Sequence, residues 1–158
     1  MGHSSTLVEI DGLRVLVDPV WEERASPVNW FGPKRFFAPV MALEELPRID
    51  VVLVSHDHYD HLGAQSIRKL AHLESAKNAQ WITSIGVGKR LRSFAVKKEK
   101  IAELDWTESL TVSSQSNSAT LKITALPSRH FSGRGLFDRF DTLWSSFVLK
   151  GDRHNIYF

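Results

Sequence analysis

The chain has 158 residues, of which 42% are hydrophobic and 24% charged, a composition typical of a folded globular domain. Its net charge of +2 at pH 7 is too small to indicate a nucleic-acid-binding protein, and its lack of cysteine excludes disulfides and thiolate metal ligands. No apolar run approaches the roughly 18 residues of a membrane-spanning helix. We therefore expect a cytoplasmic protein, with peripheral contact to a membrane as an alternative.

The chain opens with a predicted β-hairpin. Residues 7–10 and 13–17 flank Asp11-Gly12, a pair typical of tight hairpin turns. Asp18, before Pro19, ends the second strand. Residues 20–48 contain many aromatic residues and prolines with little periodicity, which indicates a long ordered loop. Its aromatic side chains either line a substrate groove or membrane-facing surface, or cover a sheet edge.

A metal-binding pattern follows the predicted buried strand of residues 51–54. His56 and His58 are two residues apart, so they point to the same side of an extended strand end. The chain then turns, and Asp60 and His61 can reach a second position beside the first. This spacing suits two cations about 3.5–4 Å apart, the arrangement used for hydrolysis of phosphate esters. We therefore predict a two-metal site, with Asp60 and His61 as its catalytic residues.

The remaining elements alternate between helix and strand at first and are then strands. Helical spacing covers residues 62–73 and 86–94, on either side of a strand at residues 81–83, which favours a layered α/β fold. Further strands are expected at residues 110–112, 121–126, 144–149 and 155–158. Basic residues cluster between Lys89 and Lys100. They form either a solvated helix face or a patch that faces anionic lipid headgroups or a phosphate-bearing substrate.

The order H-x-H-x-D-H at residues 56–61 resembles the signature of the metallo-β-lactamase superfamily. Other segments resemble one branch of it, the N-acylphosphatidylethanolamine-hydrolysing phospholipases D. These segments are Arg-Ala-Ser-Pro at residues 24–27, Gly-Pro-Lys-Arg-Phe at 32–36, Glu-Leu-Asp-Trp at 103–106 and Pro-Ser-Arg-His at 127–130. The resemblance covers nearly the whole chain and implies an αββα fold, with two sheets face to face and helices outside.

The resemblance also implies which residues bind the two metals. His56 and His58 would hold the first metal together with His130, and Asp60 and His61 would hold the second. Because the available donors are nitrogen and oxygen, we expect Zn²⁺, with Mn²⁺ or Fe²⁺ as alternatives.

Four other residues are candidates around this site. The resemblance suggests that Asp18 orients a metal-bound histidine, although a turn-forming aspartate before proline is an equally good explanation. Arg129 and Arg134 flank His130 in the sequence and could contact an anionic substrate, although surface solubility is the ordinary alternative. His3 is similar to a family position near the site, where a structural hydrogen bond is as good an explanation as a functional role.

The resemblance implies a metal-dependent phosphodiesterase that acts on an N-acylphosphatidylethanolamine-like phospholipid through a metal-activated water. One alternative is a hydrolase of the same fold that acts on a lactone or another ester. A third hypothesis is a truncated, non-catalytic metal-binding fragment, because the family pattern also contains a bridging aspartate and a final histidine that these 158 residues lack.

On that basis we expect residues 1–158 to be the N-terminal portion of one metallo-β-lactamase-like domain, truncated at its C-terminal side. One sheet face would then lack its cover, and the chain would self-associate through that face. Negligible turnover by the isolated chain is also expected.

Overall fold

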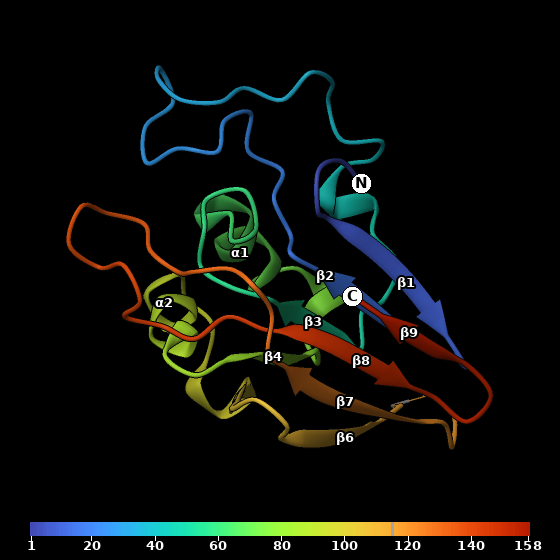
Figure 1. Cartoon of the computed structure of the whole chain (residues 1–158). Helices are drawn as coiled ribbons and strands as arrows, with labels where there is room; N and C mark the ends of the chain where they lie inside the picture. Colours follow the sequence, from blue (N-terminus) through green and yellow to red (C-terminus); the bar gives the residue numbers. More distant parts are fainter. Residues whose placement is uncertain (115) are drawn as a thin grey trace.

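Two β-sheets and a layer of helices form the fold in a computed structural model that describes residues 1–114 and 116–158 (Figure 1). The first sheet has the strand order β1 (Thr6–Ile10), β2 (Leu13–Val17), β3 (Val51–Val54), β4 (Gln80–Ser84) and β5 (Ile101–Leu104). Strands β2 to β5 are parallel, and β1 is antiparallel to β2. The second sheet is antiparallel, with the order β6 (Ser109–Ser113), β7 (Thr120–Leu126), β8 (Ser146–Lys150) and β9 (Asn155–Tyr157).

The two sheets share a hydrophobic core because side chains alternate between the faces of each strand. On β2 and β3, every second residue faces the other sheet. The buried residues of this inner core include Val15, Val17, Val51 and Leu53 from the first sheet and Leu121, Ile123, Phe147 and Leu149 from the second. The second sheet therefore covers the inner face of the first.

Helices cover the opposite face of the first sheet. Helix α1 (Ala64–Leu70) connects β3 to β4, and α2 (Val87–Ser93) connects β4 to β5, as parallel neighbouring strands require. The described residues also form three short 3₁₀ helices, of which η1 (Leu43–Glu45) and η2 (Glu74–Ala76) contribute to the outer core, whereas η3 (Lys98–Lys100) buries no residue. Leu16, Val52 and Trp81 pack against Ile67 and Leu91 in this outer core. None of the described helices is long and apolar enough to span a membrane.

The turn of the first hairpin has the backbone that its sequence requires. Asp11 and Gly12 have φ values of +46° and +90°, as in the hairpin turns that Asp-Gly favours. The Asp11 carboxylate also accepts hydrogen bonds from the backbone N–H of Arg153 (2.8 Å) and of His154 (3.0 Å), in the turn between β8 and β9. These bonds hold the pKa of the Asp11 carboxyl well below its usual range. They also connect the two sheets, because Asp11 lies in the turn between β1 and β2 and its partners lie in the turn between β8 and β9.

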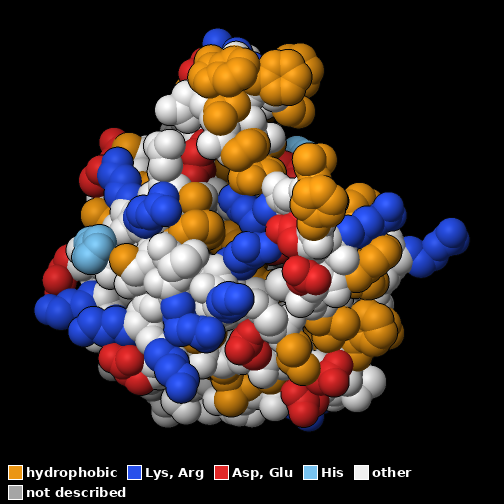
Figure 2. All heavy atoms as spheres, turned by 90° about the vertical axis from the view of Figure 1, so that its left-hand side faces the viewer, with side chains coloured by type: hydrophobic (Ala, Val, Ile, Leu, Met, Phe, Trp, Pro, Cys, Tyr) orange, Lys and Arg blue, Asp and Glu red, His pale blue; other side chains and the backbone are white. Residues whose placement is uncertain are grey.

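The predicted hairpin, the α/β layering and most of the predicted strands and helices are confirmed. Strand β5 was not predicted, since its four residues follow a basic segment and have little alternation. The Ser/Asn-rich connection between β6 and β7 includes residue 115, which lies outside the described residues. Lys89 and Arg92 on α2 are exposed, as expected for a solvated helix face, and Figure 2 shows Lys and Arg side chains gathered over this side of the molecule.

The expectation that one sheet face lacks its cover is wrong. The chain builds both sheets rather than one, and their apolar faces cover each other. The outer face of the second sheet is mainly polar, with exposed or half-exposed side chains that include Thr111, Lys122, Thr124 and Lys150. Self-association through an uncovered apolar sheet face therefore loses its physical basis.

We predict that Phe147→Ala lowers the free energy of unfolding by about 3–5 kcal/mol, because its fully buried ring fills the space between the sheets. Val148→Ala on the same strand, whose side chain lies on the outer face, should cost about 1 kcal/mol or less. Urea unfolding followed by circular dichroism measures both values. Equal losses would contradict a core between the two sheets.

Candidate metal centre

The candidate site lies where the parallel strands of the first sheet end. Asp18 follows β2, Ser55 and His56 follow β3, and the carboxyl ends of parallel strands meet at one edge of a sheet. The loop that follows β7 closes over the same edge, where Ser145 N donates to the Ser55 carbonyl at 3.1 Å. His130 belongs to this loop. The loop thereby brings His130 next to His56, from which it is 74 positions away in the sequence.

The first donor group consists of His56, His58 and His130. The Nε2 atom of His56 lies 3.0 Å from His58 Nδ1 and 2.9 Å from His130 Nε2, and the last two atoms are 3.1 Å apart. Three ring nitrogens thus converge on one point. His56 is buried, His58 is half-buried and His130 is exposed, so the point lies at the surface end of the strand.

The second donor group consists of His3, Asp60 and His61. His3 Nε2 lies 2.8 Å from Asp60 Oδ2, and His61 Nε2 lies 3.7 Å from the same oxygen. Ser4 Oγ donates to the Asp60 carbonyl at 3.0 Å and so holds the N-terminal segment against the metal loop. The sequence did not identify His3 as a donor in this group, because it is 57 residues away from Asp60 and belongs to no spacing pattern.

The Asp18 carboxylate connects the two donor groups. It is fully buried and accepts hydrogen bonds from Ser55 N at 2.7 Å and from Ser55 Oγ at 2.7 Å. His61 Nδ1 lies 2.7 Å from Asp18 Oδ2, and His56 Nδ1 lies 2.8 Å from Ser55 Oγ. One carboxylate therefore orients His61 directly and His56 through a serine hydroxyl.

This network determines which ring nitrogens face the donor groups. Ser55 Oγ donates its proton to Asp18 and accepts one from His56 Nδ1, and His61 Nδ1 donates to Asp18. The Nε2 atoms of both histidines then keep free lone pairs. Support of this kind from a carboxylate fixes the tautomer and orientation of a metal-binding histidine.

The ionisation of these side chains follows from burial and from their neighbours. Burial, together with the nearby rings of His61, His58 and His130, lowers the pKa of His56 to about 2. Burial and His130 likewise lower the pKa of His58. Both imidazoles are therefore neutral at pH 7, as a metal ligand must be.

The second group contains a carboxylate that stays ionised at neutral pH. Burial opposes the charge of Asp60, but His61 and the hydrogen bond from His3 hold the pKa of the Asp60 carboxyl below its usual range. Burial also opposes a charge on His61, yet the hydrogen bond and the charge of Asp18 raise its pKa. The second group therefore combines a carboxylate with two imidazoles.

The first donor group fits a divalent metal. The lone pair of His56 Nε2 faces two other ring nitrogens, and a shared cation satisfies all three. Around a tetrahedral Zn²⁺ with bonds of about 2.0–2.1 Å, ligand nitrogens are roughly 3.3 Å apart, close to the 2.9–3.1 Å separations here. The nitrogen and oxygen donors of the second group also suit zinc, manganese or iron.

Two residues that the sequence did not single out as supports hold the loops of the first group together. The buried Asp57 accepts a hydrogen bond from Gly133 N at 2.8 Å. Arg134 Nη1 donates to the carbonyls of Asp57 at 2.6 Å and Leu62 at 2.8 Å. Both contacts join the His130 loop to the metal loop. Arg129, by contrast, is exposed on the loop after β7.

A groove of about 620 Å³ opens beside the donors. Its lining includes His3, His58 and Asp60 from the donor groups, and apolar side chains from the loop of residues 20–37. These apolar residues are Val20, Ala25, Pro33, Phe36 and Phe37. A substrate with a long apolar part can therefore lie against this loop while its polar part reaches the donors.

A family model described as "Beta-lactamase superfamily domain" matches residues 13–158. The chain belongs to this family. The family and the fold class expected from the sequence are thus confirmed, with two sheets and with helices on the outer face of the first sheet.

Individual proteins extend this comparison. An uncharacterized protein of Mycobacterium tuberculosis is 44% identical over 157 residues, which cover 99% of this chain and 40% of that protein. The N-acyl-phosphatidylethanolamine-hydrolyzing phospholipase D 1 of Caenorhabditis elegans is 36% identical over 161 residues, covering 100% of this chain and 44% of that protein. This chain thus spans less than half the length of these relatives.

Among solved structures, an isothiocyanate hydrolase from Delia radicum gut bacteria matches with a TM-score of 0.65. The match covers 99% of this chain and 59% of that one, at 18% identity. At this identity the likeness shows the fold alone.

We predict that Asp18→Asn weakens zinc binding roughly 10- to 100-fold, because the amide keeps the shape of the carboxylate but not its charge or its acceptor for His61. Asp152→Asn, at an exposed turn on the second sheet, is the matched control and should change nothing. Competition with a chromophoric chelator measures the affinity, and circular dichroism checks the fold. Equal affinities of the two variants would show that Asp18 does not support the metal ligands.

Proposed function

We propose that this chain carries the metal centre of a metal-dependent hydrolase whose substrate is the phosphodiester of an N-acylphosphatidylethanolamine-like phospholipid. One observation carries the proposal: His58 of the first donor group and His3 and Asp60 of the second line the same groove as the apolar side chains of the loop of residues 20–37. A polar reacting group and a long acyl chain require such a combination.

His56, His58 and His130 would hold one metal, and Asp60, His61 and His3 would hold the other. A pair of divalent metals, most simply Zn²⁺, supplies an activated water and stabilises charge on phosphoryl oxygens. The protein's own contribution is orientation. Asp18 and Ser55 keep the Nε2 atoms of His56 and His61 directed at the donor groups.

The segments that resemble the phospholipase D branch build the wall of the groove. Arg24 Nη1 donates to the Gly32 carbonyl at 2.7 Å, and Ala25 N donates to the Pro33 carbonyl at 3.0 Å. Arg35 donates from Nε and Nη2 to two backbone carbonyls, at 2.9 and 2.8 Å. These bonds give the loop a fixed shape without a helix or strand, and they support a shared substrate class.

The surface around the groove supports a lipid substrate. Trp30, Phe31, Phe36 and Phe37 are 80%, 68%, 102% and 65% exposed, whereas Trp21 is half-buried and packs on the outer core. Figure 2 shows hydrophobic side chains projecting at the top of the molecule, where this loop lies in Figure 1. Exposed aromatic residues of this kind suit contact with a membrane surface. Peripheral membrane contact is therefore part of the proposal.

Two other functions compete with this one. A hydrolase of the same fold could act on a lactone or another ester, because the metal centre itself does not select phosphorus over carbon. A non-catalytic metal-binding fragment would bind metal without turnover, and the sequence lacks the bridging aspartate and final histidine that the resemblance implies.

The test compares substrates with the zinc-loaded chain. We expect N-acylethanolamine release from mixed micelles of N-acylphosphatidylethanolamine to exceed the hydrolysis of a simple lactone by at least about tenfold, because only the lipid fills the apolar groove. The ratio of the two rates decides the outcome, because it does not depend on the absolute activity of the chain. Mass spectrometry measures both products.

A chelator and Asp60→Asn should each abolish the lipid reaction. Faster lactone hydrolysis would overturn the phosphodiesterase proposal in favour of the second function. Stable zinc binding with no detectable product from either substrate would favour the non-catalytic fragment.

A further inference from the structure

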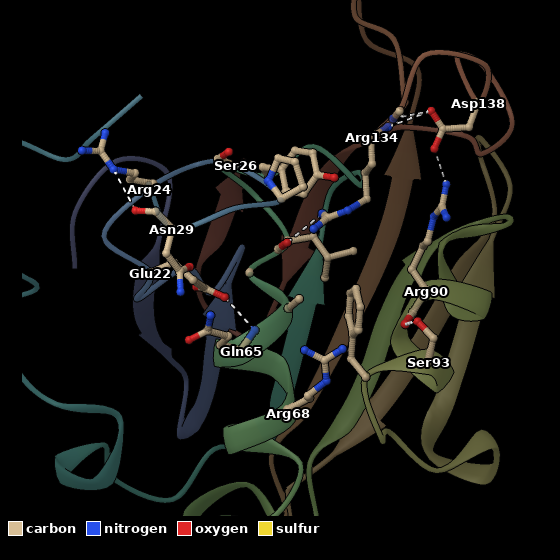
Figure 3. Close-up of a pocket in the computed structure, with 17 residues that line it drawn as sticks. Glu22, Arg24, Ser26, Asn29, Gln65, Arg68, Arg90, Ser93, Arg134 and Asp138 are labelled. Carbon is tan, nitrogen blue, oxygen red and sulfur yellow. Dashed lines mark hydrogen bonds and ion pairs between the residues drawn. The ribbon is translucent and has the colours of Figure 1, made fainter. Parts of the chain in front are cut away.

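A second cavity, of about 540 Å³, lies on the helical side of the metal loop (Figure 3). It is bounded by the segment of residues 22–29, by α1 and α2, and by the loop that follows His130. Its volume is within the range of small-molecule sites. The metal donors do not line it, and its lining contains four arginines, Arg24, Arg68, Arg90 and Arg134, against two carboxylates, those of Glu22 and Asp138.

Three of these arginines, Arg24, Arg68 and Arg134, have no carboxylate within ion-pair distance among the described residues. Among all the described residues, the arginines that form ion pairs are Arg14, Arg48, Arg90 and Arg153. The Arg68 guanidinium lies 5.0 Å from the ring centre of Phe94, and the Arg134 guanidinium lies 3.9 Å from that of Tyr59. In Figure 3 both side chains point into the cavity, Arg68 from α1 and Arg134 from the opposite wall.

The two carboxylates of the cavity are engaged in its walls. Glu22 accepts hydrogen bonds from Gln65 N at 2.7 Å and from Ser66 Oγ at 2.6 Å, at the start of α1. Asp138 accepts hydrogen bonds from Gly135 N at 2.7 Å and from Arg90 at 2.6 Å. They hold the walls in place, and neither of them forms an ion pair with Arg68 or Arg134. Burial lowers the pKa of the Arg134 guanidinium, so its charge is held at a cost that a bound anion would offset.

The chemistry of these residues selects one class of ligand. Guanidinium groups match phosphate and carboxylate oxygens in paired hydrogen bonds, and stacking on Phe94 and Tyr59 fixes the planes of these two. The two guanidinium groups that point into the cavity, those of Arg68 and Arg134, together match two negative charges. A phosphomonoester carries about −1.5 to −2 at pH 7, whereas a phosphodiester or a single carboxylate carries one. We propose that this cavity binds a phosphomonoester dianion between Arg68 and Arg134.

Tyr59 relates the cavity to the metal centre. Its side chain lines both this cavity and the groove that contains His58 and Asp60. Hydrolysis of a phosphodiester produces a phosphomonoester, so the product of the proposed reaction has the chemistry that the cavity selects. This connection rests on the proposed function, whereas binding of a phosphomonoester does not.

The experiment titrates the metal-free chain with inorganic phosphate and with glycerol phosphate in a calorimeter. Metal is removed first, so that phosphate cannot bind at the donor groups. We expect one site per chain, and we expect Arg68→Gln to weaken binding about tenfold, the effect of losing one charge-assisted contact. The matched control is Arg92→Gln, an exposed arginine of α2 outside the cavity lining, which should leave the affinity unchanged.

Several results would overturn the proposal. These are no binding by the metal-free chain, an unchanged affinity in Arg68→Gln, or equal weakening in the two variants, which would indicate only general attraction to a basic surface. The unfolding midpoint of Arg68→Gln is measured alongside. Arg134 is not replaced, because its guanidinium also holds the carbonyls of Asp57 and Leu62.

A second arm identifies the source of the phosphomonoester. Vesicles of phosphatidylcholine with and without phosphatidic acid are sedimented with the chain and with Arg68→Gln. Binding that requires phosphatidic acid and Arg68, and that glycerol phosphate displaces, supports the site and assigns it to a lipid headgroup. Binding of glycerol phosphate with no dependence of vesicle binding on Arg68 supports the site and assigns it to a soluble ligand. Because no turnover is needed, the result is independent of hydrolase activity.

Discussion

The buried carboxylate of Asp18 is the contact on which the candidate metal centre depends. It sits at the end of β2 with a φ of +44°, a left-handed conformation that aspartate tolerates better than most residues. From there it binds Ser55 at the end of β3 and His61 on the metal loop. Parallel pairing of β2 and β3 brings these positions together. The sheet thus aligns a carboxylate, a hydroxyl and two imidazoles at one edge.

The same edge of the sheet separates two cavities of different chemistry. On one side, the loop of residues 20–37 presents apolar side chains beside His3, His58 and Asp60. On the other, α1 and α2 present arginines over aromatic rings. Tyr59 lines both cavities, between two residues of the metal loop. The proposed phospholipid substrate, with an acyl chain and a phosphate, matches a candidate metal centre that lies between an apolar groove and a cationic cavity.

Local patterns predicted the parts of the site that a short segment encodes. The spacing of His56, His58, Asp60 and His61 after a buried strand was enough to propose two donor positions, and the Pro-Ser-Arg-His resemblance pointed to His130. The resemblance pointed to His3 near the site but not to its role as a donor, which depends on a contact with Asp60, 57 residues away. Ser55 belongs to no such pattern, because it contributes through a hydroxyl that links Asp18 to His56. The sequence also did not show that this chain builds both sheets and that the second covers the first. Which strands join one sheet depends on long-range pairing, and the alternation of residues within a strand does not specify that pairing.

The central claim is that two donor groups on this chain each hold one divalent metal. Elemental analysis of the purified, zinc-loaded chain, scored per protein molecule, tests it most directly when wild type is compared with His130→Ala and His3→Ala. Two zinc ions in the wild type and about one in each variant are predicted. One weakly held ion or none in the wild type, or two ions retained in both variants, would contradict the claim.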